Sequence, residues 1–155
     1  MTKLSWDAIA RGDGCPYDQP RPANTEYFDL IAPLAVSSLC LTANQAYRGS
    51  CALIFDARHA TRIDELSADE WGAYTRDLYQ AHCAIVRVCR PDHVNVALLG
   101  NTIPHLHWGI IPRYRSDPRW GHSIWMTSRV EMADVRLSPT ARAELITSLQ
   151  RELRA

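Results

Sequence analysis

The stretch from residue 101 to residue 114, which reads N-T-I-P-H-L-H-W-G-I-I-P-R-Y, constrains the fold more than any other part of the chain. From His105 onward, polar or small residues alternate with apolar ones such as Leu106 and Trp108. A period of two is typical of a β-strand with two unlike faces. We therefore expect the apolar face to pack into the interior. His105 and His107 should then point the opposite way and line a surface cleft.

Four further segments have the composition of β-strands, and turn residues separate them. They cover residues 27–33, 37–43, 50–56 and 93–100. A short connection joins the last of these to the histidine-containing strand, which predicts an antiparallel hairpin. Pro112 has no N–H to donate to a neighbouring strand, so we expect it to end the run.

Two helices are predicted from capping residues and from helical periodicity. Ser67 and Glu70 form the S-x-x-E pattern of a capping box, and apolar residues then recur at steps of three and four over residues 68–89. Ser138 followed by Pro139 predicts the start of a second, C-terminal helix, since proline is favoured at the first helical position.

These elements together predict an α+β fold: a largely antiparallel sheet of about five strands, with the long helix packed on one face and the C-terminal helix near an edge. A chain of 155 residues suits one such core and is too short for two. We assign residues 1–155 to a single domain. It has an irregular N-terminal segment at 1–26, a core at 27–125 and the C-terminal helix at 138–154.

Charge and cysteine content argue against several classes of partner and compartment. Lys and Arg together number 17, as do Asp and Glu, so net charge favours neither a nucleic acid polymer nor an anionic membrane. The five cysteines contain no CxxC pair, and several lie in apolar runs, which indicates reduced thiols and hence the cytoplasm. The N-terminus lacks the apolar core of a signal peptide, and no run approaches the roughly 18 apolar residues of a membrane span.

The histidine-containing segment resembles the signature of the histidine triad (HIT) nucleotide hydrolases and transferases, His-x-His-x-His followed by two apolar residues. His105 and His107 match the first and second positions, whereas Gly109 stands at the third. Further matches to bacterial members are Asn101, Pro104, Pro112 and Arg113. The resemblance extends over roughly residues 29–125. It implies a HIT-like fold, a homodimer in which two sheets meet, and a nucleotide-type small-molecule substrate; we expect no cofactor.

Attack by a histidine on the α-phosphorus of a nucleotide would give a nucleotidyl-histidine intermediate, which water or another acceptor then discharges. We expect His107 to be the nucleophile, the role that the resemblance also implies, and His105 to orient it or share its proton. Asn101, Asn95 and Arg113 are the candidate donors to phosphate oxygens. Asn44 is either a sugar contact, as the resemblance implies, or a turn residue that bonds its own backbone.

Gly109 leaves the extent of catalysis open. In the family, the third histidine donates to a phosphate oxygen near the transition state, and one missing donor of this type costs about 100-fold to 1000-fold in rate. Three hypotheses follow. The chain is a hydrolase or transferase acting on a dinucleoside polyphosphate, a phosphoramidate or a similar nucleotide conjugate; it is a nucleotide-binding protein with little or no turnover; or it is a His-x-His metal-binding protein.

Arginines and tryptophans are concentrated in the loop after the histidine-containing strand. They are Arg113, Arg115, Arg119, Trp120 and Trp125, with His122 among them. Guanidinium groups bind phosphate oxygens and indole rings stack on bases, so this loop suits a nucleotide. The alternative is a solvated loop with its tryptophans packed inward.

The N-terminal stretch Cys15-Pro16-Tyr17-Asp18 resembles the Cys-x-x-Cys that helps bind a structural zinc in many HIT proteins. Asp18 takes the place of the second cysteine. We therefore favour a turn with a partly buried cysteine and no metal. His59 aligns with a basic pair of relatives and could be a ligand there, but we interpret it as a surface or supporting residue.

Overall fold

The computed structural model describes residues 5–117, 119–124 and 133–155. In chain order the elements are α1 (Trp6–Ala10), β1 (Phe28–Pro33), β2 (Ser37–Thr42), β3 (Cys51–Phe55), the 3-10 helix η1 (Ile63–Glu65), α2 (Ala68–Cys89), β4 (His93–Leu98), β5 (His107–Arg113) and α3 (Pro139–Leu153). Each strand and helix expected from the sequence is present, with ends that differ by at most two residues.

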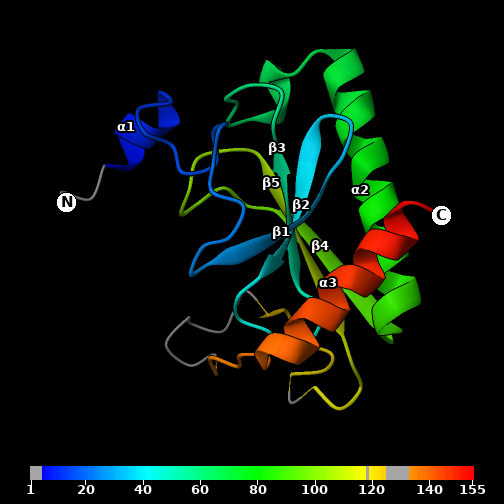
Figure 1. Cartoon of the computed structure of the whole chain (residues 1–155). Helices are drawn as coiled ribbons and strands as arrows, with labels where there is room; N and C mark the ends of the chain where they lie inside the picture. Colours follow the sequence, from blue (N-terminus) through cyan, green and yellow to red (C-terminus); the bar gives the residue numbers. More distant parts are fainter. Residues whose placement is uncertain (1–4, 118, 125–132) are drawn as a thin grey trace.

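The five strands form one antiparallel sheet in the order β1-β2-β3-β5-β4 (Figure 1). The predicted hairpin of β4 and β5 is confirmed, with His93 opposite Arg113 at one end and Leu98 opposite Trp108 at the other. Together with the two packed helices, this sheet confirms the predicted α+β architecture.

β5 differs from the prediction at both ends. It begins at His107 instead of His105, and it runs through Pro112 to Arg113. Pro112 is tolerated because β3 pairs with β5 only as far as Ile110. Beyond Ile110, β5 is therefore an edge strand on that side, and edge strands accept a residue that has no N–H to donate.

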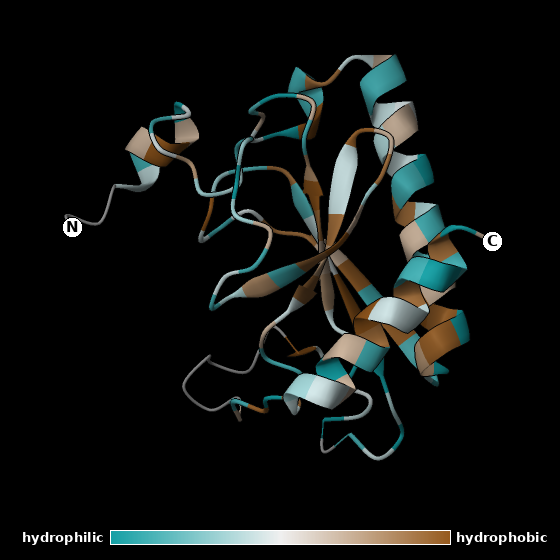
Figure 2. Ribbon diagram, in the orientation of Figure 1, coloured by the Kyte–Doolittle hydropathy of each residue, from teal (hydrophilic) through white to brown (hydrophobic). Residues whose placement is uncertain are grey.

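The main core lies between the sheet and the two long helices, which cover the same face (Figure 1). Brown, apolar segments of the strands and helices meet there (Figure 2). Its largest members are Leu39, Leu41, Leu53, Phe55 and Ile110 of the strands, Tyr74 and Ile85 of α2, and Leu145 and Leu149 of α3. Trp108 packs against Trp71 and Tyr74, each with ring centroids 6.1 Å apart. The predicted inward face of the histidine-containing strand is thus confirmed, and His107 lies on the other face.

The capping box at the start of α2 is also confirmed. The Ser67 side chain accepts from the Glu70 N–H, and the Glu70 carboxylate accepts from the Ser67 N–H. The helix ends at Arg90, whose φ of 48° turns the chain toward β4. None of the helices in the parts of the chain that the structure describes is long and apolar enough to cross a membrane.

The N-terminal segment covers part of the opposite face of the sheet. Tyr17 packs edge-on against Phe28, with ring centroids 6.2 Å apart. Phe28, Cys40 and Ile54 form a second, smaller buried cluster beneath it. This packing places residues 15–18 over the part of the sheet from which His107 projects.

Asp77 of α2 ties the helix to the turn between β1 and β2. Its buried carboxylate accepts from the N–H groups of Ala35 (3.2 Å) and Val36 (2.9 Å) and from the Ser37 hydroxyl (2.7 Å). We expect Asp77→Ala to lower the free energy of unfolding by about 2–3 kcal/mol, because these donors lose a charged acceptor away from water. Denaturant unfolding followed by circular dichroism measures this loss.

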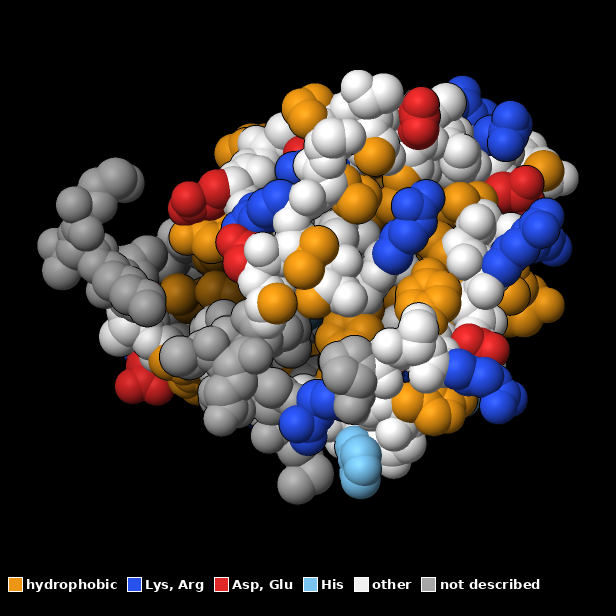
Figure 3. Space-filling model, turned by 90° about the horizontal axis from the view of Figure 1, so that it is seen from below, with side chains coloured by type: hydrophobic (Ala, Val, Ile, Leu, Met, Phe, Trp, Pro, Cys, Tyr) orange, Lys and Arg blue, Asp and Glu red, His pale blue; other side chains and the backbone are white. Residues whose placement is uncertain are grey.

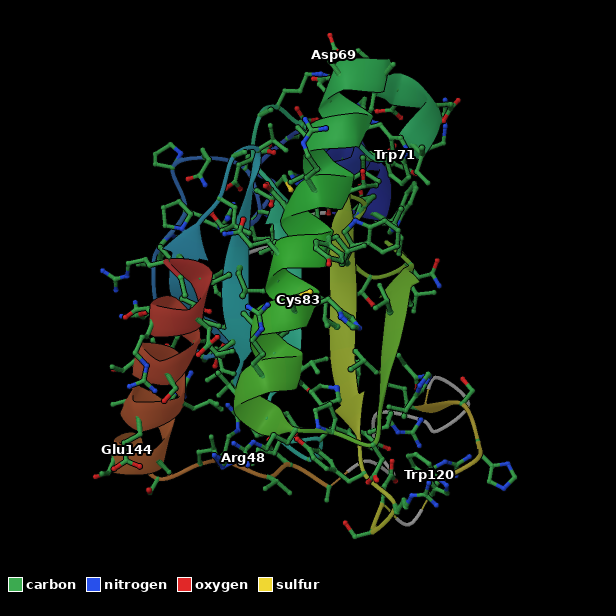
Figure 4. All side chains as sticks on the ribbon, turned by 90° about the vertical axis from the view of Figure 1, so that its right-hand side faces the viewer. Arg48, Asp69, Trp71, Cys83, Trp120 and Glu144 are labelled. Atoms are coloured by element: carbon green, nitrogen blue, oxygen red, sulfur yellow. The ribbon has the colours of Figure 1, made fainter. Side chains whose placement is uncertain are left out.

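Asp69→Ala is the matched control for that experiment. Asp69 is an exposed carboxylate in the first turn of the same helix, at the end that projects from the sheet (Figure 4). Its loss should cost less than about 1 kcal/mol. Equal losses from the two variants would show that the Asp77 hydrogen bonds contribute no more than a surface charge.

Candidate active site

His107 is the first residue of β5, and its ring is held in one orientation. Its Nδ1 lies 2.7 Å from the carbonyl oxygen of His105. A carbonyl oxygen only accepts, so Nδ1 carries the proton and Nε2 keeps a free lone pair. Tyr17 packs edge-on against the ring, with centroids 5.1 Å apart. The strand, the carbonyl and the tyrosine together fix both the position and the tautomer of this imidazole.

The surroundings of His107 also keep it neutral. Burial lowers its pKa below the ordinary histidine value, and the hydrogen bond to the His105 carbonyl opposes this only in part. The neutral form therefore dominates at neutral pH. A fixed, neutral imidazole with one nitrogen unprotonated is the form that attacks an electrophile such as phosphorus.

His105 is not where the alternating pattern predicted it. It lies in the connection before β5 and is only 1% exposed, so its ring does not line a surface cleft. The prediction was wrong because the alternation begins two residues before the strand, and the N-terminal segment closes over the ring. Burial also lowers the pKa of His105. The residue contacts His107 through its backbone carbonyl, whereas its ring belongs to a different group of side chains.

That group, called here the four-residue cluster, consists of Cys15, Asp18, His59 and His105. One donor atom of each member lies within 4.8 Å of the donor atoms of the other three. Asp18 Oδ1 is 3.0 Å from His59 Nδ1 and 3.2 Å from His105 Nδ1, and Cys15 Sγ is 3.5 Å from His105 Nδ1. His59, interpreted from the sequence as a surface or supporting residue, is in fact a partly buried member of this cluster.

The hydrogen bonds of His59 and His105 leave an unprotonated nitrogen of each ring facing the centre of the cluster. His59 Nε2 is 3.2 Å from the Ala10 carbonyl oxygen, and His105 Nε2 is 2.7 Å from that of Phe55. Each ring therefore donates its Nε2 proton outward, so in the neutral tautomer both Nδ1 atoms are acceptors. Both of them face the Asp18 carboxylate, which is an acceptor as well. A cation or a shared proton is needed to stabilise this arrangement.

The donor set fits a divalent metal ion. In a tetrahedral site with bonds of about 2.0–2.3 Å, ligand atoms lie about 3.3–3.7 Å apart. Three of the six separations, at 3.0, 3.2 and 3.5 Å, are close to those edges, and all six are within 4.8 Å. One thiolate, one carboxylate and two imidazoles are ligands that zinc takes in proteins. Backbone carbonyls are also common partners for the second nitrogen of a metal-bound histidine.

Two of the predicted phosphate donors bind each other and lie away from His107. Arg113 is 4% exposed and donates to Asn95 Oδ1 at 2.7 Å and to Asp117 Oδ2 at 2.6 Å. It also donates to two backbone carbonyls of the loop after β5. Arg113 lies six residues beyond His107 on the same strand, about 20 Å away at the rise of an extended chain. Arg113 and Asn95 therefore hold the loop after β5 against the sheet.

The other two candidate asparagines lie in connections. Asn44 Oδ1 accepts from the N–H groups of Ala46 (2.9 Å) and Val135 (3.2 Å), and its Nδ2 donates to the Ala133 carbonyl (3.0 Å). This is the turn-forming alternative, extended by two hydrogen bonds to the segment before α3. Asn101 is exposed in the connection from β4 to His105, the residue whose carbonyl orients His107.

Gly109 lies on the same face of β5 as His107, because the two residues are one strand period apart. It pairs with Ala52 of β3 and Ala97 of β4. A Cβ at this position would lie 3.8 Å from the Ala97 carbonyl oxygen and 4.0 Å from Ile111 Cδ1, which are ordinary contacts. The backbone thus does not require glycine here, and a Cβ on the His107 side of the strand makes only ordinary contacts.

The described part of the arginine-and-tryptophan loop, up to residue 124, does not adjoin His107. It lines a separate cavity of about 550 Å³ with Trp120 and His122, against His93 and Arg113 of the strands. Trp120 stacks under the Arg115 guanidinium at 5.8 Å, and it lies at the opposite end of the molecule from Trp71 (Figure 4). Arginines are spread among apolar side chains over this end of the molecule (Figure 3). Trp125 lies outside the described residues.

Tyr17 is the site residue that the sequence did not single out. Its ring packs edge-on against both histidines, with centroids 5.9 Å from His105 and 5.1 Å from His107. The only signal in the sequence was its position between Cys15 and Asp18. Which rings it contacts depends on how the N-terminal segment crosses the sheet.

No family model matches the sequence, and no curated protein matches it. The fold is similar to solved histidine triad structures. A histidine triad protein from Bradyrhizobium japonicum is 23% identical, with a TM-score of 0.75 over 83% of this chain and 92% of that one. A hypothetical histidine triad nucleotide-binding protein from Sulfolobus tokodaii is 13% identical, with a TM-score of 0.62 over 97% and 92%. A zinc-bound histidine triad family protein from Mycobacterium smegmatis is 17% identical, with a TM-score of 0.58 over 95% and 90%. The predicted HIT-like fold is thereby confirmed.

Proposed function

We propose that this chain is a nucleotide hydrolase or nucleotidyl transferase that acts at the α-phosphate of a nucleotide conjugate. His107 Nε2 attacks the phosphorus, a P–N bond forms, and the leaving group departs with its electron pair and takes up a proton. Water or another acceptor then displaces the histidine. The observation that carries this proposal is the 2.7 Å hydrogen bond between His107 Nδ1 and the His105 carbonyl, which leaves Nε2 as the nucleophilic atom.

The resemblance of the sequence to the HIT signature supports a nucleotide conjugate as the substrate. The HIT-like fold agrees with this substrate class. Suitable substrates are dinucleoside polyphosphates, nucleoside phosphoramidates and similar conjugates. One of the structural neighbours is described as nucleotide-binding. Of the predicted nucleotide contacts, Asn101 remains in the proposal because it lies in the connection to His105. Asn95, Arg113 and Asn44 are engaged elsewhere and are left out.

Gly109 favours a second candidate, a nucleotide-binding protein with little turnover. No side chain at this position can donate to a phosphate oxygen beside His107, since glycine has none. Such a protein would bind nucleoside monophosphates as the first candidate does, but it would not form the P–N bond at a useful rate. Turnover therefore separates the two candidates.

Hydrolysis of a fluorogenic adenosine phosphoramidate tests the proposal. The intermediate is sought after an alkaline quench, because P–N bonds to imidazole break in acid, and the mass of the peptide that contains His107 reports the added nucleotidyl group. Turnover with a label on His107 supports the enzyme. Nucleotide binding in calorimetry without turnover or label supports the second candidate instead.

We also propose that the four-residue cluster holds a divalent metal ion, zinc by its donor set. The outward-facing Nε2 protons and the 3.0–3.5 Å donor separations support this, and one structural neighbour is described as zinc-bound. Bound zinc would fix the His105 ring and hence the carbonyl that orients His107. His107 itself is outside the cluster, so the structure favours this site over a His-x-His metal site. Purified protein should contain about one zinc per chain, and Cys15→Ser should lose it.

A homodimer formed through β4 and the exposed side of α2 is a further part of the proposal. β4 is an edge strand, and edge strands with exposed apolar side chains pair readily with another chain. Val96 of β4 is 37% exposed and Tyr79 of α2 is 74% exposed. We expect Val96→Lys to turn a dimer into a monomer in analytical ultracentrifugation, because a buried lysine at such an interface is left unpaired.

Ile63→Lys is the control for the dimer test. Ile63 is another exposed apolar residue, but it lies on η1, so its substitution should leave the sedimentation coefficient unchanged. A monomeric wild-type protein, or an unchanged dimer in Val96→Lys, would contradict this interface.

We infer a reducing compartment, the cytoplasm, from the cysteines. All five are unpaired, and Cys15, Cys40 and Cys51 are buried. The thiols of Cys40 and Cys51 act as small apolar groups in the packing and not as cross-links.

A further inference from the structure

One side of the four-residue cluster faces a cavity of about 290 Å³. Asp18, His59 and His105 line it, as do Asp56 and Arg58. The side chains of Asp18 and His59 are 30% and 20% exposed, whereas Cys15 and His105 are buried. The cluster is therefore closed on the side of the sheet and open on the side of this cavity.

The charges around this cavity would not repel a small anion. Asp56 is paired with Arg21 at 2.7 Å, and Arg58 binds Glu70 at 3.0 Å. Within the cluster, the two positive charges of a divalent ion would balance one thiolate and one carboxylate. A ligand that enters the cavity would thus meet paired side-chain charges and a neutral metal centre.

Asp18 changes what an ion in this cluster can bind. Structural zinc sites are closed by four protein ligands, whereas catalytic sites keep a position for water or substrate and sometimes expand to five ligands. In this cluster of four protein ligands an added ligand would be the fifth. A carboxylate is a harder donor than a thiolate, so an ion bound through Asp18 keeps more affinity for an added oxygen or nitrogen ligand. The cavity is also several times larger than the roughly 30 Å³ that one water molecule occupies.

We propose that a divalent ion held by these four residues would accept a small exogenous ligand, water or a small inorganic anion, from the adjoining cavity. Asp18 is the residue that makes the site open in this way. The inference rests on the metal site proposed above and is independent of nucleotidyl transfer at His107.

Cobalt(II) spectroscopy tests the inference without measuring enzyme activity. The protein is stripped with a chelator and loaded with one equivalent of cobalt(II). A thiolate-to-cobalt charge-transfer band then reports that Cys15 is a ligand, and the intensity of the d–d bands reports the coordination number. We expect sodium azide to cause a saturable loss of d–d intensity as the ion gains a ligand. Asp18→Cys is expected to strengthen the charge-transfer band and abolish the azide response.

Each outcome tests a separate part of the proposal. A charge-transfer band that persists while the d–d bands ignore azide overturns the open site and leaves the metal site intact. Absence of the band, or its survival in Cys15→Ser, overturns the metal site as well, whereas turnover at His107 is measured separately and is unaffected. If Asp18→Cys responds to azide as the wild type does, Asp18 is not the residue responsible.

Discussion

His107→Ala will lower kcat/KM for an adenosine phosphoramidate by about 10⁴-fold or more, the scale seen when a nucleophile is removed from other enzymes. In the proposed mechanism Nε2 of this residue is the atom that bonds to phosphorus, and alanine offers nothing in its place. Nucleotide affinity should fall much less, because binding does not require the P–N bond. Steady-state kinetics with the fluorogenic substrate, together with calorimetry of a nucleoside monophosphate, measures both quantities.

Two further variants test whether the loss of activity is specific to the imidazole of His107. His107→Gln retains a polar side chain of similar reach and should be nearly as inactive as alanine, since an amide is a poor nucleophile. His93→Ala removes an exposed imidazole opposite Arg113, far along the strand pair from His107, and should leave kcat/KM within about twofold. Turnover by His107→Ala within tenfold of the wild type would remove this residue from the mechanism.

Gly109→His will raise kcat by about 100-fold to 1000-fold, the value of one well-placed donor to a developing negative charge. The new imidazole would lie on the same face as His107, one strand period away, where it can donate to a phosphate oxygen. The backbone accommodates it, because a Cβ at this position makes only ordinary contacts at 3.8 and 4.0 Å. Single-turnover kinetics separates a faster chemical step from faster product release.

The control for this variant is Gly109→Leu, which fills similar volume without supplying a donor. We expect it to leave kcat unchanged or lower it. If Gly109→His also leaves the rate unchanged or lowers it, glycine is an adaptation of the site to its substrate and not a missing catalytic group. If both variants accelerate turnover, the effect comes from filled volume instead of a hydrogen bond.

The local patterns in the sequence predicted the fold because they record which face of each element meets the interior. The S-x-x-E pattern at Ser67 placed the start of α2, and the apolar residues that follow predicted its buried side. Alternation around Trp108 predicted which side chains of β5 meet that helix. Both patterns depend only on neighbours within a few residues. They can therefore be read from the sequence without knowing how the rest of the chain folds.

The site was predicted only in part. His107 lies on the predicted strand and face with a fixed tautomer, as a nucleophile requires. Arg113 and Asn95 have side chains suited to bind phosphate, and the sequence offered no means to foresee that they satisfy each other instead. A residue type indicates which bonds a side chain can form, whereas its partner depends on which segments the fold brings into contact.

The sequence by itself determined the five strands, the two long helices and the position of His107, because periodicity and capping act over short distances along the chain. Only the tertiary structure decided that the His105 ring is buried beside Cys15, Asp18 and His59, up to 90 residues away. Contacts over such separations form when the N-terminal segment crosses the sheet. That path is set by non-local packing of residues such as Tyr17 on His107, which no pattern within one segment encodes.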